Sequence, residues 1–130
     1  FQSDRDADGD QEIYSVNTEG TALQKLTDNT EFDGVPAYSP DGSQIVFTSR
    51  RDGNAEIYVM NTDGINVQRV TNNAADDVVP SWSPDGSKIA FQSDRDGNSE
   101  VYIINTDGTG AVNLTVNAAA DAYPFWSPVK

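Results

Sequence analysis

Two stretches that are nearly the same sequence decide the fold: Phe91-Gln-Ser-Asp-Arg-Asp-Gly-Asn-Ser-Glu-Val-Tyr-Ile-Ile-Asn-Thr-Asp-Gly108 and Phe47-Thr-Ser-Arg-Arg-Asp-Gly-Asn-Ala-Glu-Ile-Tyr-Val-Met-Asn-Thr-Asp-Gly64. They lie 44 residues apart, and residues 1–20 form a third version. A period of this size indicates one supersecondary unit that is repeated and buries its faces against neighbouring copies. The identity of that unit therefore decides the fold.

Each repeat has the pattern of β-strands, because short apolar runs lie between turn signals and no amphipathic stretch of helical length occurs. The turn signals are Pro-Asp-Gly and Asn-Thr-Asp-Gly, which favour tight turns. Four antiparallel strands in 44 residues predict an all-β fold made of β-propeller blades. In one complete copy the expected strands, first to fourth, are 80–84, 87–93, 100–104 and 112–115.

TolB-type propellers, also called PD40 or WD40-like, have a repeat that resembles the run Pro80-Ser-Trp-Ser-Pro-Asp-Gly-Ser-Lys-Ile-Ala-Phe-Gln-Ser-Asp-Arg-Asp-Gly-Asn-Ser-Glu-Val-Tyr-Ile-Ile-Asn-Thr-Asp-Gly108. The resemblance extends over essentially the whole chain. It implies a six-bladed ring in a periplasmic or secreted bacterial protein. It also implies a surface that binds proteins or peptides.

The chain is expected to be one propeller module, 1–130, with repeats at about 1–46, 47–90 and 91–130, the last of them incomplete. Three blades do not close a ring, because propellers need about four to eight. The chain begins inside a second strand and ends in a first strand, so two copies would make six blades by sharing strands in a closed two-fold dimer. The residues expected to carry this self-association are Phe1, Gln2, Ser3, Tyr123, Pro124, Phe125 and Trp126.

Two alternatives to a closed dimer remain open. The counterparts of Ser87 to Ala90 are missing between the end of one copy and the start of the next, and the sequence has no initiating Met. The chain would then be a segment of a longer repeat protein or of a larger peptidase-type propeller. A head-to-tail contact that does not close would instead give a structural filament.

The composition of the chain argues against several functions. It has 21 acidic and 8 basic residues, a net charge of −13, and neither histidine nor cysteine. Nucleic acid is a poor partner because phosphate binding needs clustered Lys and Arg. No apolar run approaches the ~18 residues of a membrane helix, so membrane insertion is not expected. Without His or a Gly-x-Ser-x-Gly motif the chain cannot carry Ser-His-Asp chemistry, and we expect no enzyme.

The acidic residues fall into two groups. Asp41, Asp63, Asp85 and Asp107 lie in turns, where a short carboxylate accepts hydrogen bonds from nearby backbone amides. The others lie in the loops between second and third strands and in the crossovers between blades, which strand alternation puts at one end of the propeller. Such a face attracts cations or a basic peptide, unless nearby arginines neutralise it. The expected binding face consists of Asp52, Asp76, Asp77, Asp94, Asp96 and Asp121.

One loop has a two-residue insertion that gives Asp4-Arg-Asp-Ala-Asp-Gly-Asp-Gln-Glu12. Its pattern resembles the calcium-binding hairpin of integrin-type propellers and the front of an EF-hand. The implied cofactor is Ca²⁺, held by side chains of Asp4, Asp6 and Asp8, the carbonyl of Asp10 and the carboxylate of Glu12. Alternatively the glutamate serves the blade itself, because its counterparts in the other two repeats lie in loops that lack the three aspartates. Those counterparts are Glu56 and Glu100.

Aromatic residues also follow the period, which is typical of packing between blades. Two sets recur: Tyr14, Tyr58 and Tyr102, and Tyr38, Trp82 and Trp126. We therefore expect both sets in the core. Tyr123 and Phe125 break the repeat and are expected to cover the junction with a second chain. The expected function is a non-enzymatic scaffold that binds a protein, a peptide or a cation at its acidic face and self-associates.

Overall fold

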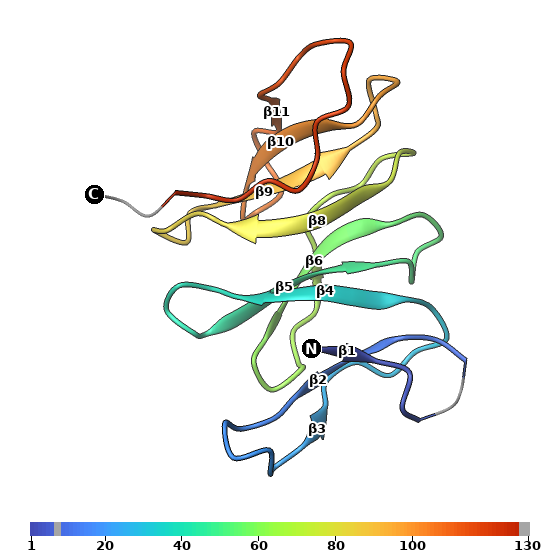
Figure 1. The fold of residues 1–130 in the computed structure, drawn as a ribbon, viewed down its shortest axis with the longest axis vertical. Coiled ribbons are helices and arrows are strands. Elements are labelled where there is room, and N and C mark those ends of the chain that lie inside the picture. The colour runs from blue at the N-terminus through green and yellow to red at the C-terminus, as the bar shows by residue number, and fades with distance from the viewer. Residues whose placement is uncertain (7–8, 128–130) are drawn as a thin grey trace.

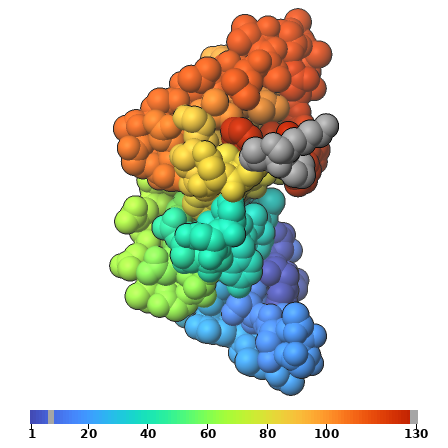
Figure 2. Space-filling model, turned by 90° about the vertical axis from the view of Figure 1, so that its left-hand side faces the viewer, coloured from blue at the N-terminus to red at the C-terminus, as the bar shows by residue number. Residues whose placement is uncertain are grey.

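The computed structural model describes residues 1–6 and 9–127, and within these ranges the chain forms strands, turns and loops but no helix. The described part therefore has no helix that could cross a membrane. The strands form three antiparallel sheets, stacked one after another along the long axis (Figure 1). Figure 2 shows the resulting elongated body, with the N-terminal sheet at one end and the last sheet at the other.

Within each sheet the strands lie side by side in chain order. The first sheet contains β1 (Gln2–Ser3), β2 (Glu12–Ser15) and β3 (Gln24–Lys25). The second contains β4 (Asp33–Tyr38), β5 (Gln44–Ser49), β6 (Glu56–Asn61) and β7 (Gln68–Arg69). The third contains β8 (Asp77–Trp82), β9 (Lys88–Ser93), β10 (Glu100–Asn105) and β11 (Val112–Asn113). The predicted all-β class and the four-stranded antiparallel blade are confirmed, and the fourth strand is shorter than expected.

The first strand of each complete blade contains a bulge at the same place. The pairing of β4 with β5 and of β8 with β9 shifts register there, and Val35 and Val79 have φ of 53° and 56°. A positive φ is unusual for a β-branched residue, so the fold must hold these two valines in a strained conformation. Each is followed by a proline, which has no amide hydrogen to donate to the ladder. Tyr123, at the same repeat position, has the same φ of 56°.

The tight turns between first and second strands follow the predicted chemistry. Gly42 has a φ of 72°, and its amide donates to the carbonyl of Ser39. The carboxylate of Asp41 accepts the hydroxyl of Ser39 and the amide of Ser43. These hydrogen bonds, that of Ser39 first, lower the pKa of Asp41 to about 2. Asp85 makes the same contacts in the next blade, which confirms that the turn aspartates are structural.

The hydrophobic core lies between the sheets, as expected for blades that pack face to face. Between the first and second sheets the buried residues are Ile13, Leu26, Ile45, Phe47, Tyr58 and Met60. Between the second and third they are Val46, Ile57, Val59, Val70, Trp82, Ile89, Phe91, Tyr102 and Ile104. Burying one such large side chain contributes about 1.5–3 kcal/mol, so these two junctions dominate the stability of the stack.

We call the first strand of each blade, such as β4 and β8, its inner strand. The expected burial of the aromatic residues on the inner strands is only partly right. Trp82 is buried, and its indole N–H donates to the carbonyl of Ala37 on the preceding inner strand, at 3.1 Å. Tyr38 is 58% exposed, because no described inner strand precedes it. Trp126 is half-buried and donates to the carbonyl of Ser81, also at 3.1 Å. Residues 121–127 form no strand in the structure, since the described chain offers no second strand to pair with them.

Candidate functional site

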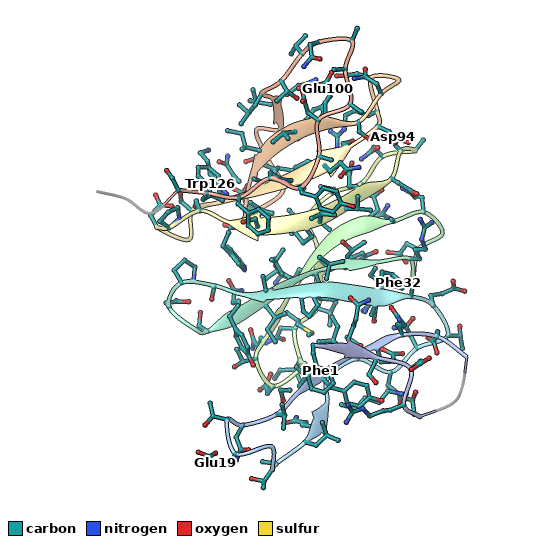
Figure 3. All side chains as sticks on the ribbon, in the orientation of Figure 1. Phe1, Glu19, Phe32, Asp94, Glu100 and Trp126 are labelled. Atoms are coloured by element: carbon teal, nitrogen blue, oxygen red, sulfur yellow. The ribbon has the colours of Figure 1, made fainter. Side chains whose placement is uncertain are left out.

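The loops between second and third strands and the crossovers between sheets lie along one side of the stack, at the same end of the strands, which we call the loop end (Figure 1). Hydrogen bonds join the two loop types there. The amide of Ala55 donates to the Asp76 carboxylate at 2.9 Å, and the amide of Asp76 donates to the Asp94 carboxylate at 3.1 Å. Figure 3 shows Asp94 at this end of the third sheet. The predicted grouping of acidic loops at one end is therefore present.

A buried glutamate begins β2, β6 and β10, one strand in each sheet, and holds the crossover that follows. One oxygen of Glu56 accepts the backbone amide of Asn73 at 2.9 Å. The side chain of Asn73 donates in turn to Asp77, at 2.7 Å, where the next inner strand begins. The same chain of contacts recurs in the other repeats, through Glu12, Asn29 and Asp33 and through Glu100, Asn117 and Asp121. The glutamate thus serves the blade itself, as the repeat suggested.

The sequence analysis did not identify the asparagine that links the glutamate to the aspartate in these contacts. Asn29, Asn73 and Asn117 follow the 44-residue period as strictly as the glutamates do. Each uses its side-chain oxygen as well, which accepts a backbone amide two residues further on. The signal was present in the sequence, but crossovers were considered only for their charges.

Arginines neutralise part of the acidic loop end. Arg51 donates to Asp33 at 2.7 Å, Arg95 to Asp77 at 2.8 Å, and Arg50 to Asp76 at 2.8 Å. The guanidinium groups of Arg51 and Arg95 also lie over aromatic rings of their own blades. Asp33 and Asp77 are fully buried, so their ion pairs are structural and their carboxylates are not available to a partner.

Burial and hydrogen bonding decide the protonation of these acids. Burial raises the pKa of Asp77, and the hydrogen bonds from Ser93 and Arg95 offset this only in part. For Glu56 burial acts in the same direction, but hydrogen bonds from Thr71, the Asn73 amide and Arg69 outweigh it and lower the pKa. The Thr115 hydroxyl and the Asn117 amide likewise lower the pKa of Glu100.

Glu12 differs from its two counterparts. Burial raises its pKa, and the Asn29 amide and the Thr27 side chain do not compensate. Lys25 takes the place of Arg69 in this blade, but its amine pairs with Asp6 and Asp28. The first blade therefore buries a carboxyl group without the arginine that the second blade provides.

The predicted calcium loop is only partly described. Asp8 lies outside the described residues, Asp6 pairs with Lys25, and Glu12 is turned toward the crossover. Among the described residues no group of three or more acidic side chains is arranged to hold a metal ion. Calcium binding by Asp4, Asp6, Asp8, Asp10 and Glu12 stays a prediction.

The six residues of the predicted binding face occupy different environments. Asp52 and Asp96 accept the hydroxyl groups of Tyr58 and Tyr102, and burial with this contact raises the pKa of Tyr102 to about 12. Asp77 is buried, and Asp121 is held by Asn117. The structure brings Asp76 and Asp94 together. They line an open cleft of 560 Å³ at the loop end, between the second and third sheets, with Asn73, Ala74, Ala75 and Arg95.

The predicted self-association residues lie in two separate places. Phe1 stacks on Tyr14 with ring centroids 5.9 Å apart, and the Gln2 side chain accepts the amide of Val35 at 2.6 Å. At the other end of the chain Tyr123 and Phe125 are 70% and 85% exposed. Ser3 pairs with Glu12, and Pro124 and Trp126 belong to the C-terminal segment beside the third sheet (Figure 3).

Comparison with known proteins agrees with this architecture. The family profile described as TolB beta propeller domain, PD40, matches residues 3–74 and 34–130. A curated relative, a TolB homolog of Chlorobium luteolum, is 43% identical over 44 residues, which are 34% of this chain and 10% of the relative.

Solved structures show the same fold. TolB from Acinetobacter baumannii is 28% identical with a TM-score of 0.75, and the match covers 88% of this chain and 29% of that one. The tricorn protease is 21% identical with a TM-score of 0.64, and the match covers 85% of this chain and 10% of the protease, a likeness that shows the fold alone. The chain thus spans less than a third of the Acinetobacter TolB structure and a tenth of the curated relative. It belongs to the TolB-type (PD40) β-propeller family.

Proposed function

We propose that these blades are part of a non-enzymatic propeller scaffold whose loop end binds a basic segment of a protein partner. The observation that carries the proposal is the open cleft at the junction of the second and third sheets, which is lined by Asp76 and Asp94. Its volume of 560 Å³ is enough for one or two lysine or arginine side chains.

The charge of the loop end supports a basic partner. The chain has 21 acidic and only 8 basic residues, and the arginines near the cleft are already paired with acids. The remaining carboxylates give this end a negative potential that would attract a cation-rich segment and speed its association. Binding by this mechanism weakens as salt screens the charges.

The carboxyl groups themselves do not favour catalysis. Of the described Asp and Glu residues, those with a raised pKa are Glu12 and Asp77, and both are fully buried. A general acid must reach its substrate, which neither side chain does.

We also propose a periplasmic or secreted location for this scaffold, because the family resemblance implies one.

The experiment is a titration of the chain with decalysine, followed by calorimetry at low salt. Asp94→Asn removes a cleft carboxylate whose only described contact is the exposed amide of Asp76, and we expect it to weaken binding about threefold to tenfold. Glu19→Gln is the matched control, because it removes one charge from the opposite end (Figure 3) and should leave binding unchanged. Equal effects of both substitutions, or no binding of decalysine, would refute the proposal.

A second candidate function is structural, as a subunit that self-associates through its end blades. The specific observation in its favour is that β1 pairs with β2 alone, while the segment 121–127 has no sheet partner in the described chain. Each is one half of a strand pair that both complete blades contain. A ring, a filament or further blades of a longer polypeptide would each supply the missing halves.

A further inference from the structure

The cleft at the loop end departs from the 44-residue repeat in the residues that line it. Its crossover has the sequence Ala74-Ala75-Asp76, where the crossover between the first and second sheets has Thr30-Glu31-Phe32. In the loop after the second strand, Asp94 takes the place of Arg50. A phenylalanine and an arginine are therefore replaced by aspartates, and two longer side chains by alanines. Figure 3 shows Phe32 and Asp94 on the same side of the stack. Such departures from the pattern that builds a fold are expected at functional sites.

The alanine wall of the cleft is fixed by hydrogen bonds within the chain. The side chain of Asn54 donates to the carbonyls of Asn73 and Ala75, at 3.2 and 2.5 Å. The amide of Ala75 donates in turn to the Asn73 side chain at 2.8 Å. A wall that is already ordered reduces the entropic cost of binding. Since Ala74 and Ala75 add no polar side chain, a long aliphatic stem can pack along them while its charged head stays in water.

The carboxylates around the cleft leave one oxygen for a ligand. Asp76 uses both of its oxygens, because Oδ1 accepts a backbone amide at 2.9 Å and Oδ2 accepts Arg50 at 2.8 Å. Both oxygens of Asp77 accept Arg95. Asp94 uses Oδ1, which accepts the amide of Asp76 at 3.1 Å. Among the described residues no group donates a hydrogen bond to Oδ2 of Asp94.

The same contacts leave one negative charge without a partner. Asp76 is paired with Arg50, and Asp77 is paired with Arg95. Arg95 lines the cleft, but the buried carboxylate of Asp77 balances its charge. The exposed carboxylate of Asp94 carries the remaining charge. The cleft therefore suits one cationic side chain.

The single free oxygen distinguishes the two common cationic side chains. Arginine binds a carboxylate most strongly through two parallel hydrogen bonds, which need both oxygens. A lysine ammonium group is a compact charge whose three donors rotate, so one oxygen is sufficient. We infer that the cleft selects lysine over arginine, with the ammonium group at Asp94 Oδ2 and the aliphatic stem along Ala74 and Ala75. This inference rests on the proposed function and names the residue of the partner that the cleft takes.

Calorimetry at low salt with two peptides of equal charge tests the preference. One peptide has five Lys-Ser repeats and the other has five Arg-Ser repeats. We expect the lysine peptide to bind the unchanged chain about threefold or more tightly. Asp94→Asn should weaken the lysine peptide and remove the difference, because both peptides then respond only to the general field of the acidic surface. Glu19→Gln, on an exposed turn, is the control and should keep the preference.

Arg50→Ala tests the count of free oxygens. Oδ2 of Asp76 loses its donor in this variant, so the cleft gains a second acceptor and a second unpaired charge. Both peptides should bind more tightly, and the arginine peptide should gain more, because two oxygens can then face its guanidinium group. The side chains of Arg50 and Asp76 are 43% and 41% exposed, so we expect the variant to stay folded, which tryptophan fluorescence checks.

The outcomes separate this inference from the proposed function. A lysine preference that disappears in Asp94→Asn supports the inference. An arginine peptide that binds as tightly as the lysine peptide, with both weakened by Asp94→Asn, would overturn the selection of lysine and leave the proposed binding surface in place. A preference that Asp94→Asn does not change, or a ratio of affinities that Arg50→Ala does not change, would overturn the role of the free oxygen. Failure of both peptides to bind would overturn the inference and the proposed function together.

Discussion

Asp77→Ala is expected to destabilise the fold strongly. The carboxylate is fully buried and accepts hydrogen bonds from Arg95 at 2.8 and 2.9 Å and from Asn73 at 2.7 Å. Removing one partner of a buried ion pair costs about 3–5 kcal/mol. The Arg95 side chain is 24% exposed, so solvent relieves part of its lost pairing, and we expect about 3 kcal/mol. For a chain of this length that corresponds to a fall in Tm of roughly 10 °C.

The assay is urea unfolding followed by tryptophan fluorescence, which reports on Trp82 at the same junction. Asp94→Ala is the control, because this exposed aspartate accepts one amide hydrogen bond and should hardly change the free energy of unfolding. The double variant Asp77→Ala/Arg95→Met should cost clearly less than the sum of the single changes, since the two residues act as a pair. Additive costs, or an Asp77→Ala variant as stable as Asp94→Ala, would refute the ion-pair reasoning.

Three further outcomes are expected. Because burial raises the pKa of Glu12, the stability that this residue contributes is present below the pKa of the unfolded chain and is lost as pH rises through the pKa of the folded chain. Glu12→Gln should therefore stabilise the chain at pH 7 relative to pH 4. Glu100→Gln should destabilise it at pH 7 and should lose that effect in acid, below the lowered pKa of Glu100. Urea unfolding at several pH values distinguishes the two variants, and parallel pH profiles would contradict both expectations. Gly64→Ala should destabilise by about 1–3 kcal/mol more than Gly20→Ala, because the added Cβ lies 2.6 Å from the Leu26 carbonyl only at Gly64, and equal unfolding midpoints would show that this contact relaxes. If calcium binds the loop from Asp4 to Glu12, millimolar Ca²⁺ should raise Tm in the unchanged chain and not in Asp4→Asn, whereas no rise in either would remove the calcium prediction.

The repeat made the fold predictable from the sequence. Strand positions, the Pro-Asp-Gly turns and the stacking of blades all follow from residues that recur every 44 positions, such as Phe47 and Phe91 or Tyr58 and Tyr102. The bulge at Val35 and Val79 was not predicted, because β-branched residues normally avoid a positive φ and only the packed sheet holds them there.

The candidate site was less predictable, since its charges depend on partners distant in sequence. Asp33 and Asp94 look alike as loop aspartates, but the first is buried against Arg51 and the second is exposed at a cleft. The exposure of Tyr38 was also missed, because its repeat position implies burial and its actual environment depends on a neighbouring inner strand. Periodicity predicts what all blades share, and it does not predict how an individual blade departs from the pattern.

The measurement that tests the proposed function most directly is a map of backbone amide shifts by nuclear magnetic resonance as decalysine is added to the isotope-labelled chain. We expect the shifts to concentrate in the loops and crossovers at residues 72–77 and 94–98, around the cleft that Asp76 and Asp94 line. The turns at the opposite end, 40–43 and 84–87, should not change. Shifts that centre on those turns, or a spectrum that decalysine leaves unchanged, would contradict the assignment of the loop end as the binding surface.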